Sequence, residues 1–516
     1  MGTAMAEPAQ RPSVTKSPTG IEGFDHISLG GVPTGRTTLV SGSAGSAKTI
    51  FAAQFLAEGI RQYDQAGVFV TFEESAADIR ANVSSLGWDV ADWEAAGKWA
   101  FVDAAPQPGD EVVVSGAFDL GALVVRVEAA VRRTGAARVA IDSLGAVFSR
   151  FENEVIVRAE LFRLASALKG MGVTSVMTAE RTSEYGEISR HGVEEFVTDN
   201  VVILRNVLEG EKRRRTVEVL KFRGTIHQKG EYPFTIMPDQ GIVVIPLSAI
   251  ELDQRSSYTR ISSGNAELDA MCGGGFFRDS VILVSGATGC GKTLTSTEFI
   301  GGGVDNGERS LLMAFEESRD QLSRNASGWG RDFDRYEREG LLKVVALYPE
   351  SAGLEDHLIR IKREIDSFKP NRVAVDSLSA LERVSSIKGF REFVISLTSF
   401  IKHQEIAGLF TATTNSLMGG ESVTETHIST ITDAIILLRY VEMFGEMKRG
   451  LTVLKMRGSA HDKEIRAFTI DGTGMHIGAA FRNVTGILAG HPRHVPSAEI
   501  ERLDQLFRPE GPRGGD

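Results

Sequence analysis

Two eight-residue runs in the chain carry the glycines, lysine and hydroxyl of a phosphate-binding loop. The later run matches the G-x-x-x-x-G-K-[ST] motif at every position and consists of Gly286, Ala287, Thr288, Gly289, Cys290, Gly291, Lys292 and Thr293. Glycine lets the backbone wrap around a phosphate, and the start of the following helix adds positive potential. We expect Lys292 to reach the β- and γ-phosphates of ATP and the Thr293 hydroxyl to ligate Mg²⁺.

The earlier run departs from the motif at one position. It consists of Gly42, Ser43, Ala44, Gly45, Ser46, Ala47, Lys48 and Thr49, so that Ala47 stands where the motif has glycine. A Cβ atom is unfavourable there only if the residue must adopt a positive φ, and a residue that enters a helix does not need one. We therefore expect this loop to bind ATP as well, with altered affinity or turnover.

Carboxylates follow apolar, strand-like segments in the neighbourhood of each loop. Asp142 and Asp376 end such segments, where nucleotide hydrolases place the acid that holds Mg²⁺ or its water shell. Two acid pairs occur in the tetrapeptide Phe-Glu-Glu-Ser, and they are Glu73-Glu74 and Glu316-Glu317. Because ligands bind at the carboxyl ends of parallel strands, we expect one acid of each pair to activate an attacking oxygen and the other to support the metal. Two solvated acids are the alternative, and the repetition of the tetrapeptide favours catalysis.

The predicted metal ligands come from both loops and their acids. They are Thr49, Asp142, Thr293, Glu316 and Asp376.

Basic residues alternate along two late strand-like segments. The pairs Lys221/Arg223 and Lys455/Arg457 would each lie on one strand face, and we predict that they act on the nucleotide of a neighbouring subunit, as arginine fingers do. A solvated strand face is the alternative. We assign these four residues and His227 to ATP binding.

A further basic run resembles a nucleic-acid patch in isolation. The run 212–215 follows a predicted hairpin turn, and the chain carries a net charge of −11. Nucleic-acid binding is therefore disfavoured.

The marked segments recur in the same order in two halves of the chain. The two phosphate loops are 286 − 42 = 244 residues apart, the acid pairs 316 − 73 = 243, and the strand-end aspartates 376 − 142 = 234. Such agreement indicates a tandem duplication. Within each copy, apolar strands alternate with helical segments, which predicts a mostly parallel twisted sheet flanked by helices.

The duplication also predicts where the domains begin and end. We expect a disordered arm at 1–16, a first domain at 17–247, a linker at 248–260, a second domain at 261–485 and a tail at 486–516. The tail has one helical candidate, Ser497–Phe507.

Composition limits the classes of protein. Of the 516 residues, 42% are hydrophobic and 24% charged, as in soluble globular proteins. No apolar run reaches the roughly 18 residues of a membrane helix, so no membrane association is expected. The cysteines Cys272 and Cys290 make no disulfide framework, which favours the cytoplasm.

Two tandem RecA-like P-loop domains, each with a phosphate loop, a Phe-Glu-Glu-Ser pair and a Lys-x-Arg-Gly strand, resemble the KaiC family of circadian clock proteins. The resemblance runs from about Ser17 to about Gly490 and is most specific at Thr424–Asp433. It implies a slow ATPase in the first domain and an autokinase and autophosphatase in the second. Its phosphorylated residues here would be Ser429 and Thr430, with Thr424 as a further acceptor.

The resemblance also implies partners. It implies a homohexamer of two stacked rings with ATP between neighbouring subunits, and a KaiB-like protein that binds the first ring. The tail after Gly490 resembles the family only loosely, which leaves a KaiA-like partner open.

The repeats support the same division of labour from the residues alone. At the 234-residue offset, Ser429 and Thr430 correspond to Glu195 and Phe196, which carry no hydroxyl. A phosphoryl acceptor of this kind therefore belongs to the second copy. Two other functions stay open, a RecA-like DNA recombinase or helicase and a nucleotide-gated scaffold without kinase activity.

Overall fold

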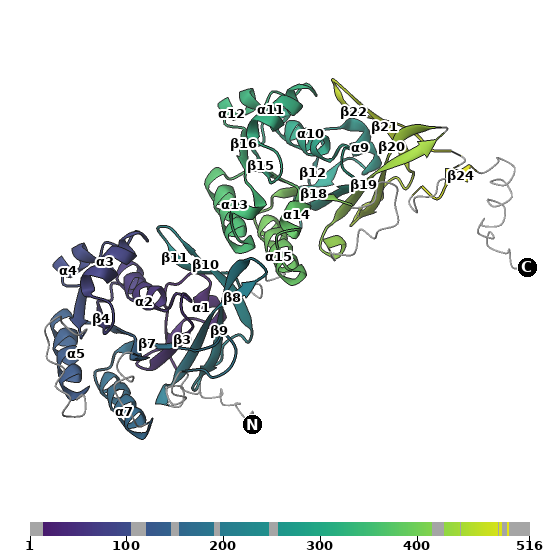
Figure 1. Cartoon of the computed structure of the whole chain (residues 1–516). Coiled ribbons are helices and arrows are strands. Elements are labelled where there is room, and N and C mark those ends of the chain that lie inside the picture. The colour runs from purple at the N-terminus through teal and green to yellow at the C-terminus, as the bar shows by residue number, and fades with distance from the viewer. Residues whose placement is uncertain are drawn as a thin grey trace, which may run out of the picture. The chain divides into compact units, whose positions relative to one another are not determined.

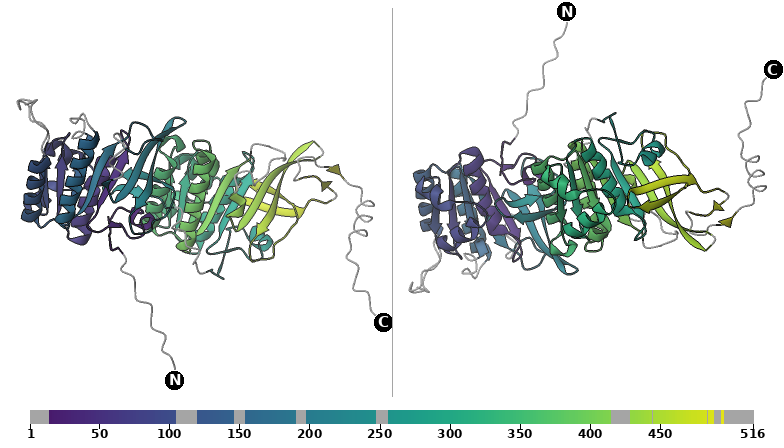
Figure 2. Two further views of the ribbon diagram at one scale, coloured as in Figure 1. Left: turned by 90° about the horizontal axis from the view of Figure 1, so that it is seen from below. Right: turned by 90° about the horizontal axis from the view of Figure 1, so that it is seen from above.

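The computed structural model describes residues 14–104, 120–145, 154–189, 197–246, 256–414, 428–443, 445–482, 484–487, 493 and 494. The chain forms two compact units, Met1–Ile250 and Glu251–Asp516, which we describe separately (Figure 1). Figure 2 shows the same two units from two further sides. No helix among these residues is long and apolar enough to cross a membrane.

The first unit is built on one nine-stranded sheet with the order β11-β10-β9-β8-β3-β7-β6-β4-β5. The strands from β8 to β5 are parallel to one another, and β9, β10 and β11 continue the sheet as antiparallel neighbours. The strand bounds are β3 (Thr37–Gly42), β4 (Gly67–Thr71), β5 (Trp99–Asp103), β6 (Arg138–Asp142), β7 (Thr174–Glu180), β8 (Asn200–Glu209), β9 (Lys212–Phe222), β10 (Glu231–Met237) and β11 (Gly241–Val244).

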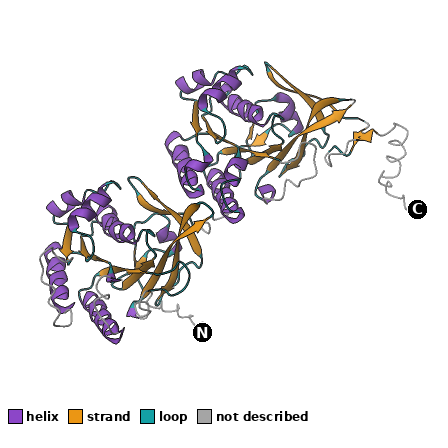
Figure 3. Ribbon diagram, in the orientation of Figure 1, coloured by secondary structure: helices purple, strands orange, loops and turns teal. Residues whose placement is uncertain are grey.

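Helices cover both faces of this sheet (Figure 3, helices purple and strands orange). They are α1 (Phe24–Ile27), α2 (Lys48–Tyr63), α3 (Ala76–Ser84), α4 (Val90–Ala95), α5 (Leu120–Thr134) and α7 (Glu154–Gly170). Adjacent residues of β3 show the two-sided burial, because Val40 packs in the core that contains Phe55 of α2 and Leu39 in the core that contains Leu161 of α7. A strand buried on both faces reads as a continuous apolar run, which is why these strands were visible in the sequence.

The second unit repeats the same architecture. Its sheet order, β16-β15-β17-β18-β14-β19-β20-β21-β22, matches the first unit strand for strand when read from the parallel edge. The bounds are β14 (Val281–Gly286), β15 (Ser310–Ala314), β16 (Leu342–Ala346), β17 (Arg372–Asp376), β18 (Ala407–Thr413), β19 (Ala434–Met443), β20 (Glu446–Met456), β21 (Arg466–Asp471) and β22 (Gly474–Ala480). The predicted fold of two tandem RecA-like domains is thereby confirmed.

Its helices and short elements complete the inventory of the described residues. The helices are α9 (Ala266–Met271), α10 (Lys292–Asp305), α11 (Arg319–Ser327), α12 (Phe333–Arg338), η2 (Pro349–Ser351), α13 (Leu354–Phe368), α14 (Leu378–Glu382), α15 (Ile387–His403) and η3 (Ile428–Thr430). Two small two-stranded sheets of this unit join β12 (Arg260–Ile261) to β13 (Phe276–Phe277) and β23 (Val484–Thr485) to β24 (Arg493–His494). In the first unit, a similar small sheet joins β1 (Lys16–Ser17) to β2 (Val32–Pro33).

The structure shifts two expected boundaries. Lys16, which we placed in a disordered arm, lies in β1 and its ammonium donates to the carbonyl of Ile226 at 2.8 Å. Arg260, which we placed in the linker, starts β12. Each residue pairs with the next short strand of its unit, Lys16 with Pro33 and Arg260 with Phe277, and a two-residue strand is too short to show a periodic pattern in the sequence. The predicted tail helix at Ser497–Phe507 lies outside the described residues.

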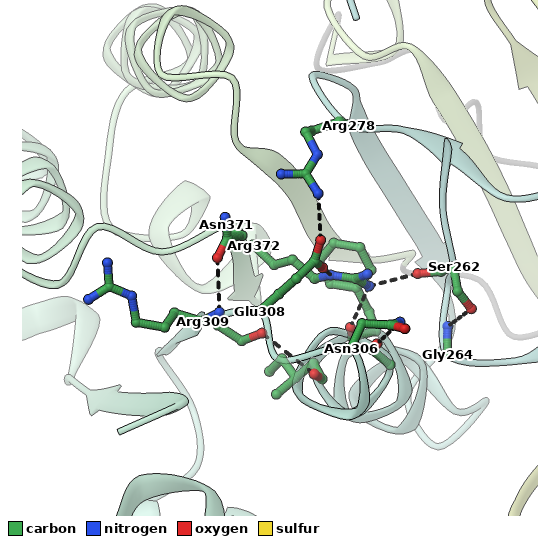
Figure 4. A network of polar contacts seen from close by, with 12 residues as sticks. Ser262, Gly264, Arg278, Asn306, Glu308, Arg309, Asn371 and Arg372 are labelled. Atoms are coloured by element: carbon green, nitrogen blue, oxygen red, sulfur yellow. Dashed lines mark hydrogen bonds and ion pairs between the residues drawn. The ribbon is translucent and has the colours of Figure 1, made fainter. Parts of the chain in front are cut away.

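A buried arginine ties three parts of the second unit together (Figure 4). Arg372, the first residue of β17, donates to Glu308 at 2.6 Å and to the carbonyl oxygens of Ser262 at 2.6 Å and Phe299 at 3.0 Å. Burial lowers the pKa of Arg372, against the opposing charge of Glu308. The side chain thus joins the start of the unit to α10 and to the central sheet.

Arg138 occupies the same position in the first unit. It donates to the carbonyl oxygens of Pro18 and Phe55, both at 2.7 Å. Burial lowers its pKa to about 10. The tie is therefore a property of the duplicated fold and not of one copy.

We predict that Arg372→Met destabilises the second unit by about 3 kcal/mol or more, because the substitution removes the buried donor to the Ser262 and Phe299 carbonyl oxygens and leaves Glu308 with Arg278 but without Arg372. Urea unfolding followed by circular dichroism measures the loss. Arg309→Met is the matched control, since Arg309 is exposed next to the same network. Equal losses in the two variants would contradict the role of Arg372.

Candidate nucleotide sites

The second phosphate loop leaves β14 at Gly286 and enters α10 at Lys292. The Lys292 ammonium donates to the carbonyl oxygens of Gly286 at 2.9 Å and Ala287 at 3.0 Å. A Cβ atom on Gly286 would come within 2.4 Å of the Leu438 carbonyl oxygen, and Gly289 and Gly291 have φ of 79° and 111°. Glycine is needed at position 286 for space and adopts a positive φ without strain at positions 289 and 291, as in a loop whose backbone wraps around a phosphate.

The first phosphate loop has the same shape, and this corrects our expectation for Ala47. Ala47 precedes α2 with φ 74° and ψ 29°, in the left-handed region that Gly291 also occupies. For a residue with a Cβ atom this conformation costs about 1–2 kcal/mol. The expectation that Ala47 would avoid a positive φ was wrong, because the loop geometry fixes φ at this position whichever residue fills it.

Each loop threonine lies within reach of the strand-end aspartate. Thr49 Oγ1 donates to Asp142 Oδ2 at 2.7 Å, and a hydroxyl on the neighbouring strand β7, that of Thr178, donates to Oδ1. Asp376 is hydrogen-bonded by Thr293 and Thr411 in the same way, and burial raises its pKa. A hydroxyl and a carboxylate oxygen side by side are a suitable pair of ligands for Mg²⁺.

No group of three or more His, Cys, Asp or Glu side chains that could hold a metal occurs among the residues described. A magnesium ion at this position would therefore share its shell with phosphate oxygens and water, as is usual for Mg²⁺.

The two acids of each Phe-Glu-Glu-Ser segment have different partners. In the second unit, Glu316 accepts from Ser377 Oγ at 3.1 Å and Arg383 Nη2 at 2.6 Å, while Glu317 accepts from Asn325 Nδ2 at 2.9 Å. Burial, aided by the charge of Asp376, raises the pKa of Glu317. The first acid of the pair thus lies beside the residue that follows the strand-end aspartate, and the second turns toward α11.

The first unit repeats these contacts. Glu73 accepts from Ser143 Oγ at 3.0 Å and Glu74 from Asn82 Nδ2 at 2.9 Å. Burial, followed by the charge of Asp142, raises the pKa of Glu74. Sequence reasoning missed these serines and asparagines as partners of the acids. Their repetition could have pointed to them, since the serines are 234 residues apart and the asparagines 243.

The Lys-x-Arg pair of the second unit lies at the other edge of the sheet from the phosphate loop. Lys455 donates to the carbonyl oxygens of Ser429 and Thr432, both at 2.7 Å, and Arg457 donates to that of Thr430 at 2.6 Å. Burial and the charge of Arg457 lower the pKa of Lys455. The two basic side chains therefore hold the turn that carries the predicted acceptors, in which Ser429 is half-buried and Thr430 exposed.

Strand register sets the distance between this turn and the loop. β14 and β19 are parallel, with Ile282 opposite Ala434 and Gly286 opposite Leu438. The strand from Ala434 to Leu438 alone spans about 13 Å, and the acceptor turn precedes it. The acceptors and the basic pair are therefore remote from the phosphate loop of their own unit.

The basic residues of the first unit are placed in the same way. Lys221 donates to the Thr198 carbonyl at 3.2 Å, and Arg223 lies 3.6 Å from Asp199. His227 follows on the next loop, with its ring 5.5 Å from that of Phe222. Since Asn200 pairs with both Thr38 and Phe222, these residues also lie at the edge opposite Gly42. Arg223 and Arg457 each come one residue after the strand that we predicted to contain them, since β9 ends at Phe222 and β20 at Met456.

The basic run 212–215 forms part of the predicted hairpin between β8 and β9. Arg213 donates to the Asn206 carbonyl at 2.8 Å, Arg214 lies 3.8 Å from Glu209, and Arg215 donates to the Gly45 carbonyl at 3.2 Å. The run thus supports its own hairpin and the first phosphate loop. Arg215 is a contact to that loop that sequence reasoning did not identify, although its repeat partner Arg449 is also basic.

We predict that Ala47→Gly raises the free energy of unfolding of the first unit by up to about 1 kcal/mol, because it removes left-handed strain that the loop carries without ligand. Gly291→Ala is the matched opposite change in the second unit, and its Cβ would also meet Ile470 at 3.2 Å. Urea unfolding of the two variants, followed by circular dichroism, measures both effects. An unchanged free energy of unfolding in both variants would contradict the argument.

Comparison with known proteins identifies the family of the chain. The family model described as "ATPase: KaiC" matches residues 17–249 and 261–481. The chain is 67% identical over 494 residues to the circadian clock protein KaiC3 of Synechocystis sp., covering 96% of this chain and 98% of that protein. It is 57% identical to the circadian clock oscillator protein KaiC of Thermostichus vulcanus, covering 96% and 95%, and 55% identical to that of Synechococcus elongatus, covering 97% and 96%. The chain therefore belongs to the KaiC family of ATPases.

Proposed function

We propose that this chain is a hexameric ATP-dependent autokinase and autophosphatase with a slow ATPase activity, which phosphorylates its own Ser429 and Thr430 as a timing or signalling state. The observation that carries the proposal is the contact of Lys455 and Arg457 with the turn that bears these two hydroxyls. The relatives named above are circadian clock proteins, which favours a role in timing.

The residues of the second unit supply each part of a phosphoryl transfer. Lys292 would bind the β- and γ-phosphates, and Thr293 with Asp376 would hold Mg²⁺, which neutralises charge on the phosphates. Glu316 would take the proton from the acceptor hydroxyl as its oxygen attacks the γ-phosphorus. The bond from the γ-phosphorus to the β-phosphate oxygen breaks, ADP leaves, and the phosphate ester stays on the acceptor.

The acceptor must come from another subunit for this chemistry to occur. Because the acceptor turn and the phosphate loop lie at opposite edges of one sheet, we propose that each turn faces the ATP of its neighbour in a closed ring. Lys221, Arg223 and His227 would serve the first ring in the same way. A KaiB-like protein is the expected partner of the first ring, and a KaiA-like partner stays open.

Two other functions are less well supported. A DNA recombinase or helicase needs exposed basic loops, whereas the basic run 212–215 is engaged within its own hairpin and the net charge is −11. A scaffold without kinase activity would bind ATP and transfer no phosphate. Incubation with Mg·ATP followed by mass spectrometry of Ser429 and Thr430 separates the three.

We predict that Glu316→Gln lowers the rate of autophosphorylation by about 100-fold or more, because the amide keeps the shape and loses the basicity of the carboxylate. Phosphate incorporation measured over time tests this. Asp320→Asn is the control, since its side chain on α11 is 91% exposed. A Glu316→Gln protein that incorporates phosphate at the wild-type rate would remove Glu316 from the mechanism.

We predict that transfer occurs between subunits. Rings assembled from Lys292→Ala chains and Ser429→Ala/Thr430→Ala chains should place phosphate on the Lys292→Ala chain, which has acceptors and lacks the phosphate-binding lysine. The unmixed variants should carry no phosphate at positions 429 and 430. Absence of phosphate in verified mixed hexamers would show that transfer is confined to one subunit.

A further inference from the structure

Among the buried polar side chains of the helices that follow the phosphate loops, Gln54 and Glu298 occupy the same repeat position (298 − 244 = 54). Gln54 of α2 is 1% exposed and Glu298 of α10 is 6% exposed. Gln54 Oε1 accepts from the Ile242 amide at 2.6 Å and Glu298 Oε1 from the Met475 amide at 2.7 Å. Both amides belong to the last strand of the main sheet, so each side chain ties that strand to the helix.

Each of these helix side chains comes so close to the last strand that the strand needs a glycine at the point of contact. Gly241 and Gly474, which precede the two amides, have φ of 81° and 119°. A Cβ atom would come 2.5 Å from Gln54 Oε1 and 2.7 Å from Glu298 Oε1. In both units, the glycine of the last strand therefore makes room for this helix side chain.

The two units differ in the charge of the tie. Gln54 Nε2 donates to the Ile242 carbonyl at 3.1 Å, so one neutral amide makes both bonds. Glu298 offers no such donor, and Asn265 donates instead to the Met475 carbonyl at 2.7 Å and to Glu298 Oε2 at 3.4 Å. The repeat position of Asn265 in the first unit is Ile21 (265 − 244 = 21). The second unit has thus replaced Gln54 and Ile21 by an acid and an amide.

The strand held by Glu298 lies against the phosphate loop. A Cβ atom on Gly291 would meet Ile470 at 3.2 Å, Met475 at 3.6 Å and Phe468 at 3.7 Å. These three side chains come from β21 and β22. Since Gly291 directly precedes Lys292, the position of this hairpin bears on the lysine that binds phosphate.

Glu298 can change its proton state under ordinary conditions. Burial raises its pKa to about 7, against the lowering effects of the Met475 amide, Asn265 and Arg331, and Glu267 on α9 raises it further. The other charged groups nearby have partners of their own, since Arg331 pairs with Asp305, Asp269 accepts from Ser262 and Ser263, and His476 lies 3.1 Å from Asp471.

Protonation alters the contact with Asn265. The ionised carboxylate accepts at both oxygens, whereas a proton on Oε2 would face the Asn265 amide, which is itself a donor. The neutral form therefore loses the bond between Asn265 and Glu298, the two side chains that hold Met475 of the hairpin. Gln54 has no proton to exchange in this range.

We propose that Glu298 is a positioning residue for the second phosphate loop, and that its proton state makes ATP binding at this site depend on pH while the first site does not share the dependence. The inference rests on ATP binding by the second unit and does not require the proposed kinase activity. Acid conditions loosen the hairpin and weaken binding.

Hydrogen exchange of the full-length protein with a non-hydrolysable ATP analogue tests each loop separately. From pH 8 to pH 6, with exchange corrected for intrinsic rates, the analogue concentration that half-protects the peptide containing Lys292 should rise at least about five-fold, at the low end of typical coupling between sites. The peptide containing Lys48 controls for titration of the analogue's own phosphates and should shift less.

Glu298→Gln should abolish the difference between the two loops in how far the half-protecting analogue concentration shifts with pH. Glu267→Gln removes a neighbouring exposed charge and should keep that difference. Equal pH profiles in wild type and Glu298→Gln, or equal shifts at both loops, would overturn the proposal. If Glu298→Gln folds poorly, hydrogen exchange of two backbone amides in the wild-type protein decides instead. The proposal requires that the Met475 amide lose protection toward pH 6 and that the Ile242 amide keep it. Protection by the analogue without any phosphate transfer would refute the kinase and leave this inference standing.

Discussion

The parallel pairing of β14 with β19 is the constraint on which the rest of the molecule depends. A phosphate loop must leave the carboxyl end of its strand, and a turn that precedes the neighbouring parallel strand must lie at the opposite end. Lys455 and Arg457 return to that opposite end because β20 is antiparallel to β19, with Lys455 opposite Ile435. The first unit repeats this arrangement through β3, β8 and β9. Each unit therefore carries its phosphate loop at one end of the parallel strands and its Lys-x-Arg pair at the other.

The duplication preserved this scaffold and changed the chemistry placed on it. Arg138 and Arg372 make equivalent contacts with the start of their units, and the acid pairs keep the same serine and asparagine partners. Some differences involve the phosphate loop and the helix that follows it, where Ala47 corresponds to Gly291 and Gln54 to Glu298. Another lies before β19, where Ser429 and Thr430 correspond to Glu195 and Phe196. The shared contacts hold the same fold in both units, and these differing residues are the candidates for what distinguishes the two sites.

Most of the scaffold could be predicted from the sequence because its signals are local. A strand buried on both faces is a short apolar run, and the phosphate loop is a contiguous motif, so the strands, loops and strand-end acids were identified. The φ of Ala47 could not be predicted from the residue type, since the loop that surrounds it imposes the angle. The place of Lys455 relative to Ser429 depends on pairing between β19 and β20, which the repeats alone do not specify. The burial of Glu298 depends on Gly474, which is 176 residues later in the chain (474 − 298 = 176).

The contacts of Glu316 bear on how the second site could become active. Its ion pair with Arg383 measures 2.6 Å, yet the two side chains are 42% and 60% exposed. Exposed pairs of this kind contribute about 0–1 kcal/mol, so an incoming hydroxyl can displace Arg383 at little cost. Glu298, by contrast, is enclosed between α10, β22 and Asn265, and a change in its proton state cannot be absorbed by solvent. Glu316 is thus exposed and weakly paired, so it can exchange partners, whereas Glu298 is buried and bonded to β22 and to Asn265.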